Sequence, residues 1–432
     1  MRESIKKRIE AVRCGEVPEG YVSENHQLRP ANWQYEKIGK YLVPYEEFSN
    51  DTEAYPLATS SRQGLMLQSE YYNDQRYEET SGGFHVVPVG YVTYRHMSDD
   101  DIFRFNVNKM GQSVLVSPEY PVFTTTRGLN QDLLVAYLNG MKEFQAFCSA
   151  QKKGSTRTRM YFRRLGEFTM PIPSITEQQK IADILATCDR MIELKQSKID
   201  ELNKLKQVCL LEMFPQKGQT IPKRRFPGFS ALWEQRKLSS LCDKFTDGDW
   251  IESKDQSGSG VRLIQTGNVG LAEYLDKPNN KKWVSNDTFE ALHCEEVFEG
   301  DILISRLPEP AGRACIVPNL GTKMITAVDC TIVRVSENIN NKFLLQYLSS
   351  QKYFDEVNTC LAGGTRQRIS RSNLANFDIP MPTEKSEQVA IGSFLTNLDR
   401  LITLHQRELA EVGKYKKALM QLLLTGLVRV NA

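Results

Sequence analysis

The chain has 432 residues, more than one hydrophobic core of ordinary size organises, so two domains with connecting segments are expected. Hydrophobic residues make up 40% and charged residues 25%, which is ordinary for a globular protein. The 55 Lys and Arg nearly balance the 53 Asp and Glu, so a phosphate-rich partner requires positive charge to gather on one face.

The cysteine and histidine content argues against a disulfide framework and a structural zinc site. The nine cysteines are scattered, no C-x-x-C pair occurs, and His293-Cys294 is the only adjacent His/Cys pair among five histidines. Reduced thiols suit a cytoplasmic protein. The first residues lack the apolar core of a signal peptide, and no run of 18 apolar residues predicts a membrane span.

Residues 1–20 are predicted to form an N-terminal helical segment, with a short helix over 3–13. Residues 21–175 read as a first compact domain of mixed α/β or α+β character. Its β-rich runs include Phe84–Tyr94 and Ser113–Ser117, followed by a helical stretch over Asp132–Ala150. We predict no strand order from this pattern.

Basic residues gather toward the end of this first domain and in a loop near its start. Lys and Arg beside Ser, Thr and Gly suit contacts with phosphates, and Arg and Gln are able to contact base edges in the major groove. The alternative for each residue is an ordinary solvated surface role. The candidate DNA-binding residues here are Arg62, Gln63, Arg95, Lys152, Lys153, Arg157 and Arg159.

A long helix is predicted over 176–215, where apolar residues recur at alternating spacings of four and three. Ser174 and Glu177 have the spacing of a capping box at its start. The residues predicted to form the seam of this helix are Leu185, Cys188, Ile192, Ile199 and Leu202.

Residues 216–383 are predicted to form a second mixed domain, entered through a linker rich in Pro, Gly, Lys and Arg at 215–228. Asp301–Ser305 and Cys330–Val335 are β-rich, and Asn341–Val357 is helical in pattern. The candidate DNA-binding residues of this domain are Arg306, Arg313, Arg366, Arg368 and Arg371.

A second long helix is predicted over 384–432, with the same alternating spacing. Its predicted seam consists of Leu395, Leu398, Ile402, Leu409 and Val412. Polar residues interrupt both seams at one register, Lys195 with His405 and Lys206 with Lys416. Such groups either fix the register or lie with their stems along the interface, and the sequence does not decide between these roles.

The two long helices are copies of one another. Residues 177–214 align with residues 387–424 at a constant offset of 210, with 12 of 38 positions identical by direct inspection. The repeat continues upstream, where Thr156-Arg157-x-Arg159-Met160 matches Thr365-Arg366-x-Arg368-Ile369, and Trp33 echoes Trp233 at the start of each unit. The middles of the two domains look unrelated. A duplicated frame with divergent contents therefore predicts a pseudo-twofold protein.

Two such helices most simply pack as an antiparallel pair. A helix of 38 residues is roughly 57 Å long at 1.5 Å per residue. A spacer of that length would span about 17 base pairs at about 3.4 Å per step.

Motifs of catalysis are missing from the sequence. No G-x-x-x-x-G-K-[ST] loop, no G-x-G-x-x-G after a strand, and no [Asn/Asp]-Pro-Pro-aromatic tetrapeptide occurs. Glu252-x-Lys254 fits a nuclease pattern only in a way that any chain this charged would. With a duplicated frame and basic loops, these absences favour a binding protein.

The architecture resembles the specificity subunit of type I restriction-modification systems, often called HsdS. Pro171-x-Pro173 followed by Glu177-Gln-Gln-Lys-Ile-Ala looks like the family's start of its spacer helix, and Pro380-Met-Pro382 with Glu387-Gln-Val-Ala-Ile looks like the second copy. Asp189-Arg190 and Asp399-Arg400 continue the match. The resemblance covers nearly the whole chain, and the repetition of these motifs in order makes it specific.

The resemblance implies that each domain reads one half of a bipartite, asymmetric site in double-stranded DNA, while the helices fix the gap. Two methyltransferase subunits would dock on the helical pair and modify an adenine in each half, flipping the base from the stack. Two translocase-nuclease subunits would complete the restriction enzyme. S-adenosylmethionine, ATP and Mg²⁺ would belong to those partners, and this chain would bind no cofactor or metal.

Two alternatives remain open at the level of sequence. The chain is a scaffold whose helices only mediate oligomerisation, or it is a stand-alone DNA methyltransferase or nuclease of unusual sequence. Sequence-selective DNA binding with partners would exclude the first, and inertness of the purified chain would count against the second.

Overall fold

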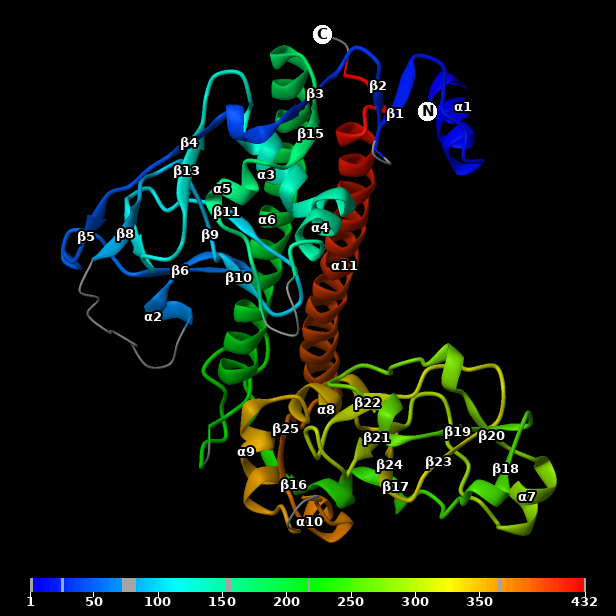
Figure 1. The fold of residues 1–432 in the computed structure, drawn as a ribbon. Coiled ribbons are helices and arrows are strands. Elements are labelled where there is room, and N and C mark those ends of the chain that lie inside the picture. The colour runs from blue at the N-terminus through cyan, green and yellow to red at the C-terminus, as the bar shows by residue number, and fades with distance from the viewer. Residues whose placement is uncertain are drawn as a thin grey trace. The chain divides into compact units, whose positions relative to one another are not determined.

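The computed structural model describes residues 3–24, 27–71, 83–152, 157–216, 218–363 and 367–430. The chain forms two compact units: unit 1 comprises residues 1–194 and 408–432, and unit 2 comprises residues 195–407. Two long helices, α6 (Ile175–Glu212) and α11 (Lys385–Leu424), each contribute one segment to each unit (Figure 1).

Unit 1 contains a four-stranded antiparallel sheet in the order β11-β9-β13-β4 and a three-stranded sheet in the order β12-β8-β5, with two-stranded ribbons β1-β2, β3-β15, β6-β7 and β10-β14. Its helices and strands, besides the segments of α6 and α11, are α1 (Glu3–Arg13), β1 (Tyr21–Glu24), β2 (Gln27–Pro30), β3 (Gln34–Lys37), η1 (Ile38–Lys40), β4 (Leu42–Pro44), β5 (Phe48–Ser49), β6 (Ala58–Ser61), β7 (Gly64–Leu67), α2 (Gln68–Tyr71), β8 (Phe84–Val87), β9 (Val92–Tyr94), β10 (Met97–Ser98), β11 (Phe105–Val107), β12 (Val114–Val116), β13 (Val122–Thr125), α3 (Gln131–Gly140), α4 (Lys142–Ser149), β14 (Thr158–Arg159), α5 (Phe162–Leu165) and β15 (Thr169–Ile172).

The core of unit 1 joins its four-stranded sheet to the long helices. Tyr94 and Phe123 from the sheet, Tyr137 from α3, Leu185 from α6 and Leu423 from α11 belong to one buried cluster. Burying large aromatic and aliphatic side chains is the main stabilising term in folding. The four-stranded sheet of unit 1 is therefore packed together with α3 against the two long helices.

Unit 2 contains a four-stranded antiparallel sheet in the order β17-β24-β21-β22 and a four-stranded mixed sheet in the order β18-β20-β19-β23, in which β19 and β23 are parallel. Its elements, besides the long helices, are β16 (Glu234–Lys237), η2 (Leu238–Leu241), β17 (Cys242–Asp247), η3 (Ser253–Asp255), β18 (Gln256–Ser257), β19 (Val261–Ile264), η4 (Thr266–Asn268), η5 (Pro278–Asn280), β20 (Lys282–Val284), α7 (Asn286–Ala291), β21 (Ile302–Ser305), β22 (Ala314–Ile316), β23 (Met324–Thr326), β24 (Cys330–Val335), α8 (Asn341–Tyr347), α9 (Gln351–Thr359), α10 (Arg371–Ala375) and β25 (Asp378–Met381).

Strand β21 shows how the core of unit 2 is layered. Successive side chains of a strand point to opposite faces of the sheet. Ile302 and Ile304 accordingly belong to the cluster that includes the long helices, whereas Leu303 belongs to a second cluster on the other face, with Ile264 of the mixed sheet. A strand buried on both faces reads as a continuous apolar run, as this one does.

The helix predicted over 3–13 is confirmed as α1, but the two helical stretches predicted inside the domains are each two helices and not one. The stretch 132–150 is broken at Met141, which is extended (φ −97°, ψ 134°) and buried. Gly140 ends the first helix where the Met420 side chain from α11 packs against its backbone, so a Cβ there would lie 2.2 Å from that side chain. The stretch 341–357 is likewise divided into α8 and α9, with Ser350 capping α9.

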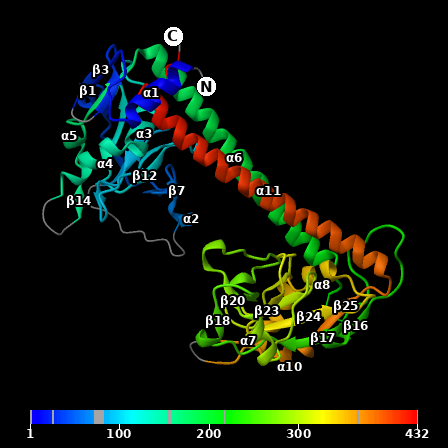
Figure 2. The ribbon, with the colours of Figure 1, turned by 90° about the vertical axis from the view of Figure 1, so that its right-hand side faces the viewer.

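The segments of α6 and α11 run antiparallel within each unit and lie side by side (Figures 1 and 2). In unit 1, Glu177 near the start of α6 contacts Arg429, which follows the end of α11. In unit 2, Glu387 near the start of α11 contacts Arg225, which follows the end of α6. The predicted α+β class with an internal repeat and two long antiparallel helices is confirmed.

The capping box predicted at the start of α6 is only half formed. Ser174 Oγ accepts a hydrogen bond from the Glu177 backbone N–H at 3.4 Å. The Glu177 carboxylate does not return to Ser174, because it accepts hydrogen bonds from Arg429 and from Trp33 Nε1 instead.

Candidate nucleic-acid interface

The predicted seam residues lie along the paired helix segments, with unequal burial. In unit 1, Leu185 is buried, whereas the other seam residues are only partly covered. In unit 2, every predicted seam residue is buried. The partly covered residues are Cys188, Ile192, Leu409 and Val412, and the buried residues of unit 2 are Ile199, Leu202, Leu395, Leu398 and Ile402.

Two of the lysines that interrupt the seams, Lys206 and Lys416, form reciprocal ion pairs across the two helices. Lys206 of α6 pairs with Asp399 of α11, and Lys416 of α11 pairs with Asp189 of α6. Gln346 from α8 also donates to Asp399 at 2.8 Å. Each lysine head therefore has a partner on the opposite helix, which fits a role in fixing register. Both aspartates belong to the Asp-Arg pairs that repeat in the sequence, Asp189-Arg190 and Asp399-Arg400.

A second reciprocal pair lies at the two ends of the frame. Arg429 Nε and Nη2 donate to the Glu177 carboxylate at 2.7 and 2.8 Å, and Arg225 Nε and Nη2 donate to Glu387 at 2.6 and 2.8 Å. These forked hydrogen bonds raise the pKa of both arginines. Both arginines lie outside the aligned repeat, so the sequence comparison missed them.

The glutamines that follow these glutamates connect α6 to α3 in unit 1 and α11 to α8 in unit 2 by hydrogen bonds. Gln178 Oε1 accepts from the Asn130 backbone N–H at 2.7 Å, and Gln388 Oε1 accepts from Asn340 N–H at 2.9 Å. Asn130 and Asn340 are the N-caps of α3 and α8. The repeated Glu-Gln motif therefore holds α3 in unit 1 and α8 in unit 2, which is a structural role.

The basic candidates of unit 1 meet a run of three aspartates. Arg157 Nε donates to Asp99 Oδ1 at 2.6 Å, Arg62 pairs with Asp100, and Lys152 Nζ lies 3.6 Å from Asp101 Oδ1. The exposed arginine heads and these carboxylates are brought together from three separate stretches of chain. Arg95, Gln63 and Arg159 are also exposed, and Arg159 Nη1 lies 3.5 Å from the Tyr161 hydroxyl.

Asp100 is a fixed carboxylate within this group. Burial acts to raise its pKa, but hydrogen bonds from Ser98 Oγ, Arg62 and the Ile102 N–H outweigh burial and lower the pKa. Asp100 is therefore ionised at neutral pH and neutralises part of the positive charge. The run Asp99–Asp101 was not among the predicted site residues, although its position soon after Arg95 in the sequence could have indicated pairing with basic residues.

The basic candidates of unit 2 divide into exposed and buried residues. Arg368 Nη2 lies 3.2 Å from Asp329 Oδ1, and Arg371 Nε lies 3.9 Å from Asp247 Oδ2, with both arginine side chains about half exposed. Arg306 is buried: its Nη2 donates to Val328 O at 2.6 Å, and its Nε lies 3.4 Å from Asp247 Oδ1. Arg306 therefore supports the segments that carry Asp329 and Asp247, the carboxylates that pair with the exposed arginines.

Arg313 has a structural role, contrary to the expectation that it reads bases. Its guanidinium is buried and donates to the backbone carbonyls of Val269, Thr266, Leu307 and Pro310 at 2.7 to 3.0 Å. Arg carries five N–H donors. Here these donors pair backbone carbonyls of residues 266–269 and 307–310 that burial would otherwise leave without partners. The candidates Lys153 and Arg366 lie outside the described residues.

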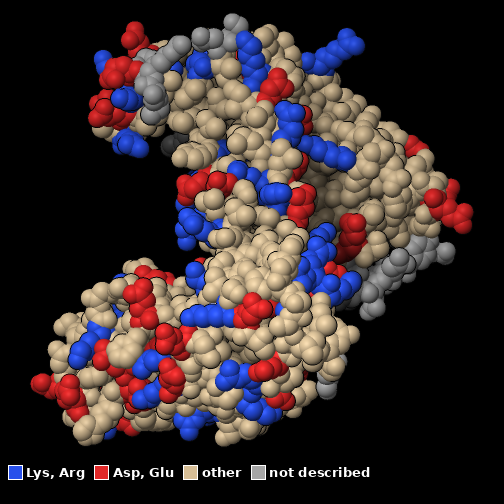
Figure 3. All heavy atoms as spheres, turned by 180° about the vertical axis from the view of Figure 1, so that it is seen from behind, with Lys and Arg blue, Asp and Glu red and all other residues tan. Residues whose placement is uncertain are grey.

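Positive charge is not segregated over the face seen in Figure 3, where Lys and Arg are interspersed with Asp and Glu. The ion pairs of Arg62, Arg157, Arg368 and Arg371 agree with this pattern. Surface pairs of this kind contribute little to stability, roughly 0–1 kcal/mol each. A phosphate group is therefore able to compete for these arginines at small cost.

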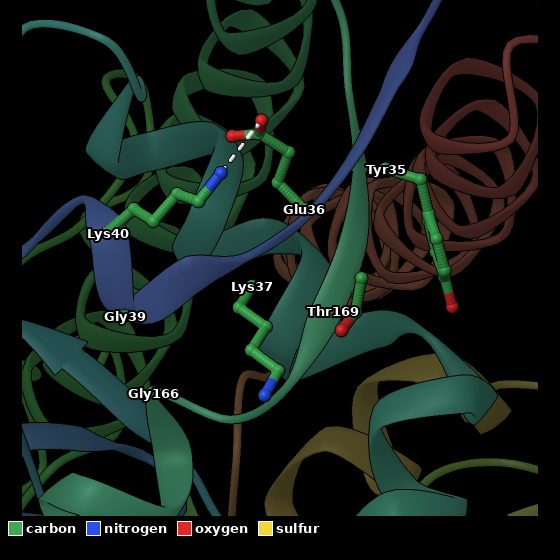
Figure 4. A pocket seen from close by; sticks show the side chains of 7 residues that line it. All are labelled: Tyr35, Glu36, Lys37, Gly39, Lys40, Gly166 and Thr169. Atoms are coloured by element: carbon green, nitrogen blue, oxygen red, sulfur yellow. Dashed lines mark hydrogen bonds and ion pairs between the residues drawn. The ribbon is translucent and has the colours of Figure 1, made fainter.

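A pocket beside the frame of unit 1 carries no arrangement for catalysis. It is lined by residues of β3, η1 and β15 and their neighbours, and Figure 4 shows Lys40 paired with Glu36 at its edge. Gly39 and Gly166 touch at its base, where a Cβ on Gly39 would lie 2.7 Å from Gly166 O. The remaining lining side chains are Tyr35, Lys37 and Thr169. This set offers no nucleophile activated by a neighbouring base.

The cysteines do not supply a reactive thiol where burial is deep. Burial raises the pKa of Cys148, Cys242 and Cys315 to about 12, so these thiols stay protonated at neutral pH. Among the described residues, no three His, Cys, Asp or Glu side chains are grouped to hold a metal ion. No described helix combines the length and apolar character needed to cross a membrane.

Comparison with known proteins identifies the family. Residues 102–204 and 231–414, more than half of the chain, match the family described as the type I restriction modification DNA specificity domain. The chain therefore belongs to the type I restriction modification DNA specificity family. Its two matched segments fall on either side of the linker at 215–228.

Two curated relatives come from Methanocaldococcus jannaschii. The type I restriction enzyme MjaVIII specificity subunit is 26% identical over 337 residues, covering 74% of this chain and 76% of the relative. The putative type I restriction enzyme MjaX specificity subunit is 27% identical over 305 residues, covering 69% and 68%.

Solved structures share the fold at low sequence identity. The S subunit of a type I restriction-modification system from M. genitalium has a TM-score of 0.55 at 14% identity, covering 93% of this chain and 97% of that one. A chain from a structural study of the complex assembly and conformational transition of the type I R-M system has a TM-score of 0.52 at 17% identity, covering 93% and 99%.

Proposed function

We propose that the chain is the DNA-specificity subunit of a type I restriction-modification complex, in which each recognition domain reads one half of a bipartite, asymmetric site. The domains would comprise residues 21–175 and 216–383. The single observation that carries the proposal is the reciprocal frame, in which Glu177 with Arg429 and Glu387 with Arg225 repeat the same contacts around divergent contents. A repeated frame with different loops suits two readers of different half-sites.

The long helices would set the unread gap and dock two methyltransferase subunits. Both helices expose apolar residues at positions 210 apart, and helical periodicity places each set within an arc of about 60° on its helix. An exposed apolar stripe of this kind suits a protein partner. The paired positions are Met191 with Leu401, Leu194 with Leu404, and Leu205 with Tyr415.

The chain itself would be non-catalytic and would act in the cytoplasm. S-adenosylmethionine would be bound by the methyltransferase subunits, and ATP and Mg²⁺ by two translocase-nuclease subunits. Burial keeps the thiols of Cys148 and Cys242 protonated, so neither supplies a nucleophile at neutral pH. The chain supplies the sequence information, and its partners supply the chemistry.

Reconstitution tests the proposal. The chain is purified alone and with its methyltransferase partner, and each sample is assayed for methyl transfer from S-adenosylmethionine to a library of duplexes. We expect no transfer by the chain alone and transfer to a bipartite subset of duplexes by the complex. Transfer by the chain alone would favour a stand-alone enzyme, and a complex without sequence selection would favour a scaffold.

A further inference from the structure

Trp250 is the most exposed large apolar residue of unit 2 among the described residues, with 72% of its surface accessible. Trp33 and Trp233, in the frame, are buried. A tryptophan side chain is highly buried on average, so one held in solvent requires an explanation. The residue follows strand β17 by three positions.

The backbone around Trp250 is fixed, so its exposure does not come from a loose loop. The N–H groups of Gly248 and Asp249 donate to Cys330 O and Thr326 O at 2.9 Å, and Asp249 O accepts from Val328 N–H at 2.9 Å. A Cβ on Gly248 would lie 2.3 Å from Thr326 O, so only glycine permits this approach. The indole is therefore presented by a rigid support.

The turn that supports Trp250 also supports the arginines of unit 2. Arg306 donates to Val328 O, and Arg368 pairs with Asp329, both residues of the turn 326–330. Arg371 lies against Asp247, three residues before Trp250. An exposed indole on a fixed turn, whose Nε1 donates to Glu252 Oε1 at 3.2 Å, and two half-exposed guanidinium groups thus share one platform.

This combination matches the chemistry of duplex DNA. Guanidinium groups suit phosphates, and an apolar ring suits thymine methyl groups or an opened base step. A protein partner recognised by the same face would meet the alternating charges of Asp247, Asp329 and the arginines at the centre of its interface, where charged residues are depleted.

We propose that Trp250 contacts bases in the half-site read by unit 2, with Arg368 and Arg371 holding the flanking phosphates. The inference rests on the proposed DNA-reading function and deepens it by naming a base-contacting residue. An apolar contact releases no counterions, whereas an arginine on a phosphate does. Trp250 and Arg368 therefore contribute to affinity in ways that salt separates.

The test uses the assembled complex with its methyltransferase subunits and a fluorescent duplex that carries the motif methylated by that complex. Binding is measured over a series of salt concentrations for wild type, Trp250→Ala, Trp250→Phe and Arg368→Ala. Phe298→Ala is the matched control, because Phe298 is an exposed aromatic residue that precedes β21, at the opposite end of that strand from Arg306. A second duplex carries uracil in place of each thymine of the half-site.

We expect Trp250→Ala to weaken binding to the motif by roughly 5- to 150-fold with an unchanged salt slope, and Trp250→Phe to recover part of the loss. Arg368→Ala should lower the slope by about 1, and Phe298→Ala should bind as wild type does. A contact with thymine methyl groups predicts that the uracil duplex weakens wild type but not Trp250→Ala. A wedge at a base step predicts no such difference.

Trp250→Ala that binds as tightly as wild type, while Arg368→Ala is weakened, overturns the inference and leaves the proposed function intact. A wild-type complex with no preference for the motif overturns both. Two readouts remain should Trp250→Ala fold poorly. The first is binding by Trp250→Phe, which keeps an aromatic ring. The second is a change in indole fluorescence on binding, which Trp250→Phe should lack.

Discussion

Units 1 and 2 use the same frame to hold different surfaces. In both units, a glutamate near the start of a long helix is held by an arginine that follows the other helix, and the next residue, a glutamine, binds the N-cap of a small helix. These contacts depend on a few residues at fixed positions. The loops beyond them are free to diverge, because they contribute little to the frame.

The two frames differ in how completely their polar groups are satisfied. Glu177 accepts from Trp33 Nε1 at 3.0 Å in addition to Arg429. Trp233 Nε1 is buried and has no hydrogen-bond partner among the described residues, and the Glu387 carboxylate accepts its two hydrogen bonds from Arg225. The duplicated tryptophan and glutamate positions therefore have different hydrogen-bond partners in the two units.

The largest expected effect is on unit 2, from Glu387→Ala. Only 11% of the Arg225 side chain and 1% of the Glu387 side chain are exposed, so the variant leaves an unpaired buried charge. Loss of one partner of such a pair costs about 3–5 kcal/mol. Glu177→Ala also leaves Trp33 Nε1 without its acceptor, but it should cost less, because 30% of the Arg429 side chain is exposed and the charge reaches water. Denaturant unfolding of both variants, with exposed Glu384→Ala as control, measures the difference; equal losses would contradict it.

Arg159→Ala and Arg368→Ala should act on separate halves of the DNA site. These arginines occupy matching positions in the repeat and are exposed in units 1 and 2. Each loss should weaken binding of the complex and lower its salt slope by about 1, and the two losses should add. Arg127→Ala is the control, since Arg127 follows strand β13, whereas Arg159 lies in strand β14. Non-additive losses in a binding titration would mean that the units do not read independently.

Asp399→Ala should destabilise the protein more than Asp189→Ala does. Asp399 holds Lys206 and the buried Gln346, so its loss leaves two poorly solvated groups and should cost about 2 kcal/mol. Asp189 is 45% exposed, and its pair with Lys416 should contribute about 1 kcal/mol or less. Thermal unfolding compares the two variants. A larger loss for Asp189→Ala would show that the seam of unit 1 bears more of the stability.

The smallest expected effect is a titration confined to unit 1. The hydrogen bond to Glu36, with burial second, raises the pKa of Tyr41 to about 12. Because the folded value exceeds the unfolded value near 10, the associated stability is present below about pH 10 and is lost as pH rises through about 12. The matching residues of unit 2, by the offset of Trp33 and Trp233, are Arg236 and Leu241.

Ultraviolet difference titration of wild type against Tyr41→Phe measures this group. Glu36→Gln should lower the Tyr41 pKa toward its ordinary value, because the hydrogen bond to a carboxylate is removed. Glu47→Gln is the control, since Glu47 binds Tyr45 and not Tyr41. A Tyr41 titration unaffected by Glu36→Gln would show that burial alone sets its pKa.

The sequence predicted the long helices and their buried residues because helical periodicity is local. Ile199 and Leu395 could be assigned from spacing alone, and both are buried. Local pattern also placed the apolar strands of unit 2, whose residues 302–305 and 330–335 are β-strands. Where the helix is interrupted, at Met141, the preceding Gly140 lies against the Met420 side chain of α11, a contact that no local pattern contains.

The sequence did not predict which charged residues meet. Arg225 and Arg429 lie outside the aligned repeat, and Arg157 is 58 residues from Asp99. Arg313 was predicted as a candidate DNA-binding residue, yet backbone carbonyls of Val269 and Thr266 enclose its guanidinium. Such assignments depend on tertiary contacts that neither composition nor spacing specifies.

Mapping adenine methylation across the genome tests the central claim most directly. Cells that carry the methyltransferase partner are compared with and without this chain. The account predicts a bipartite motif, with two different half-sites and a fixed gap, that is methylated only when the chain is present. An identical methylation pattern in both cells would contradict the assignment of sequence specificity to this protein.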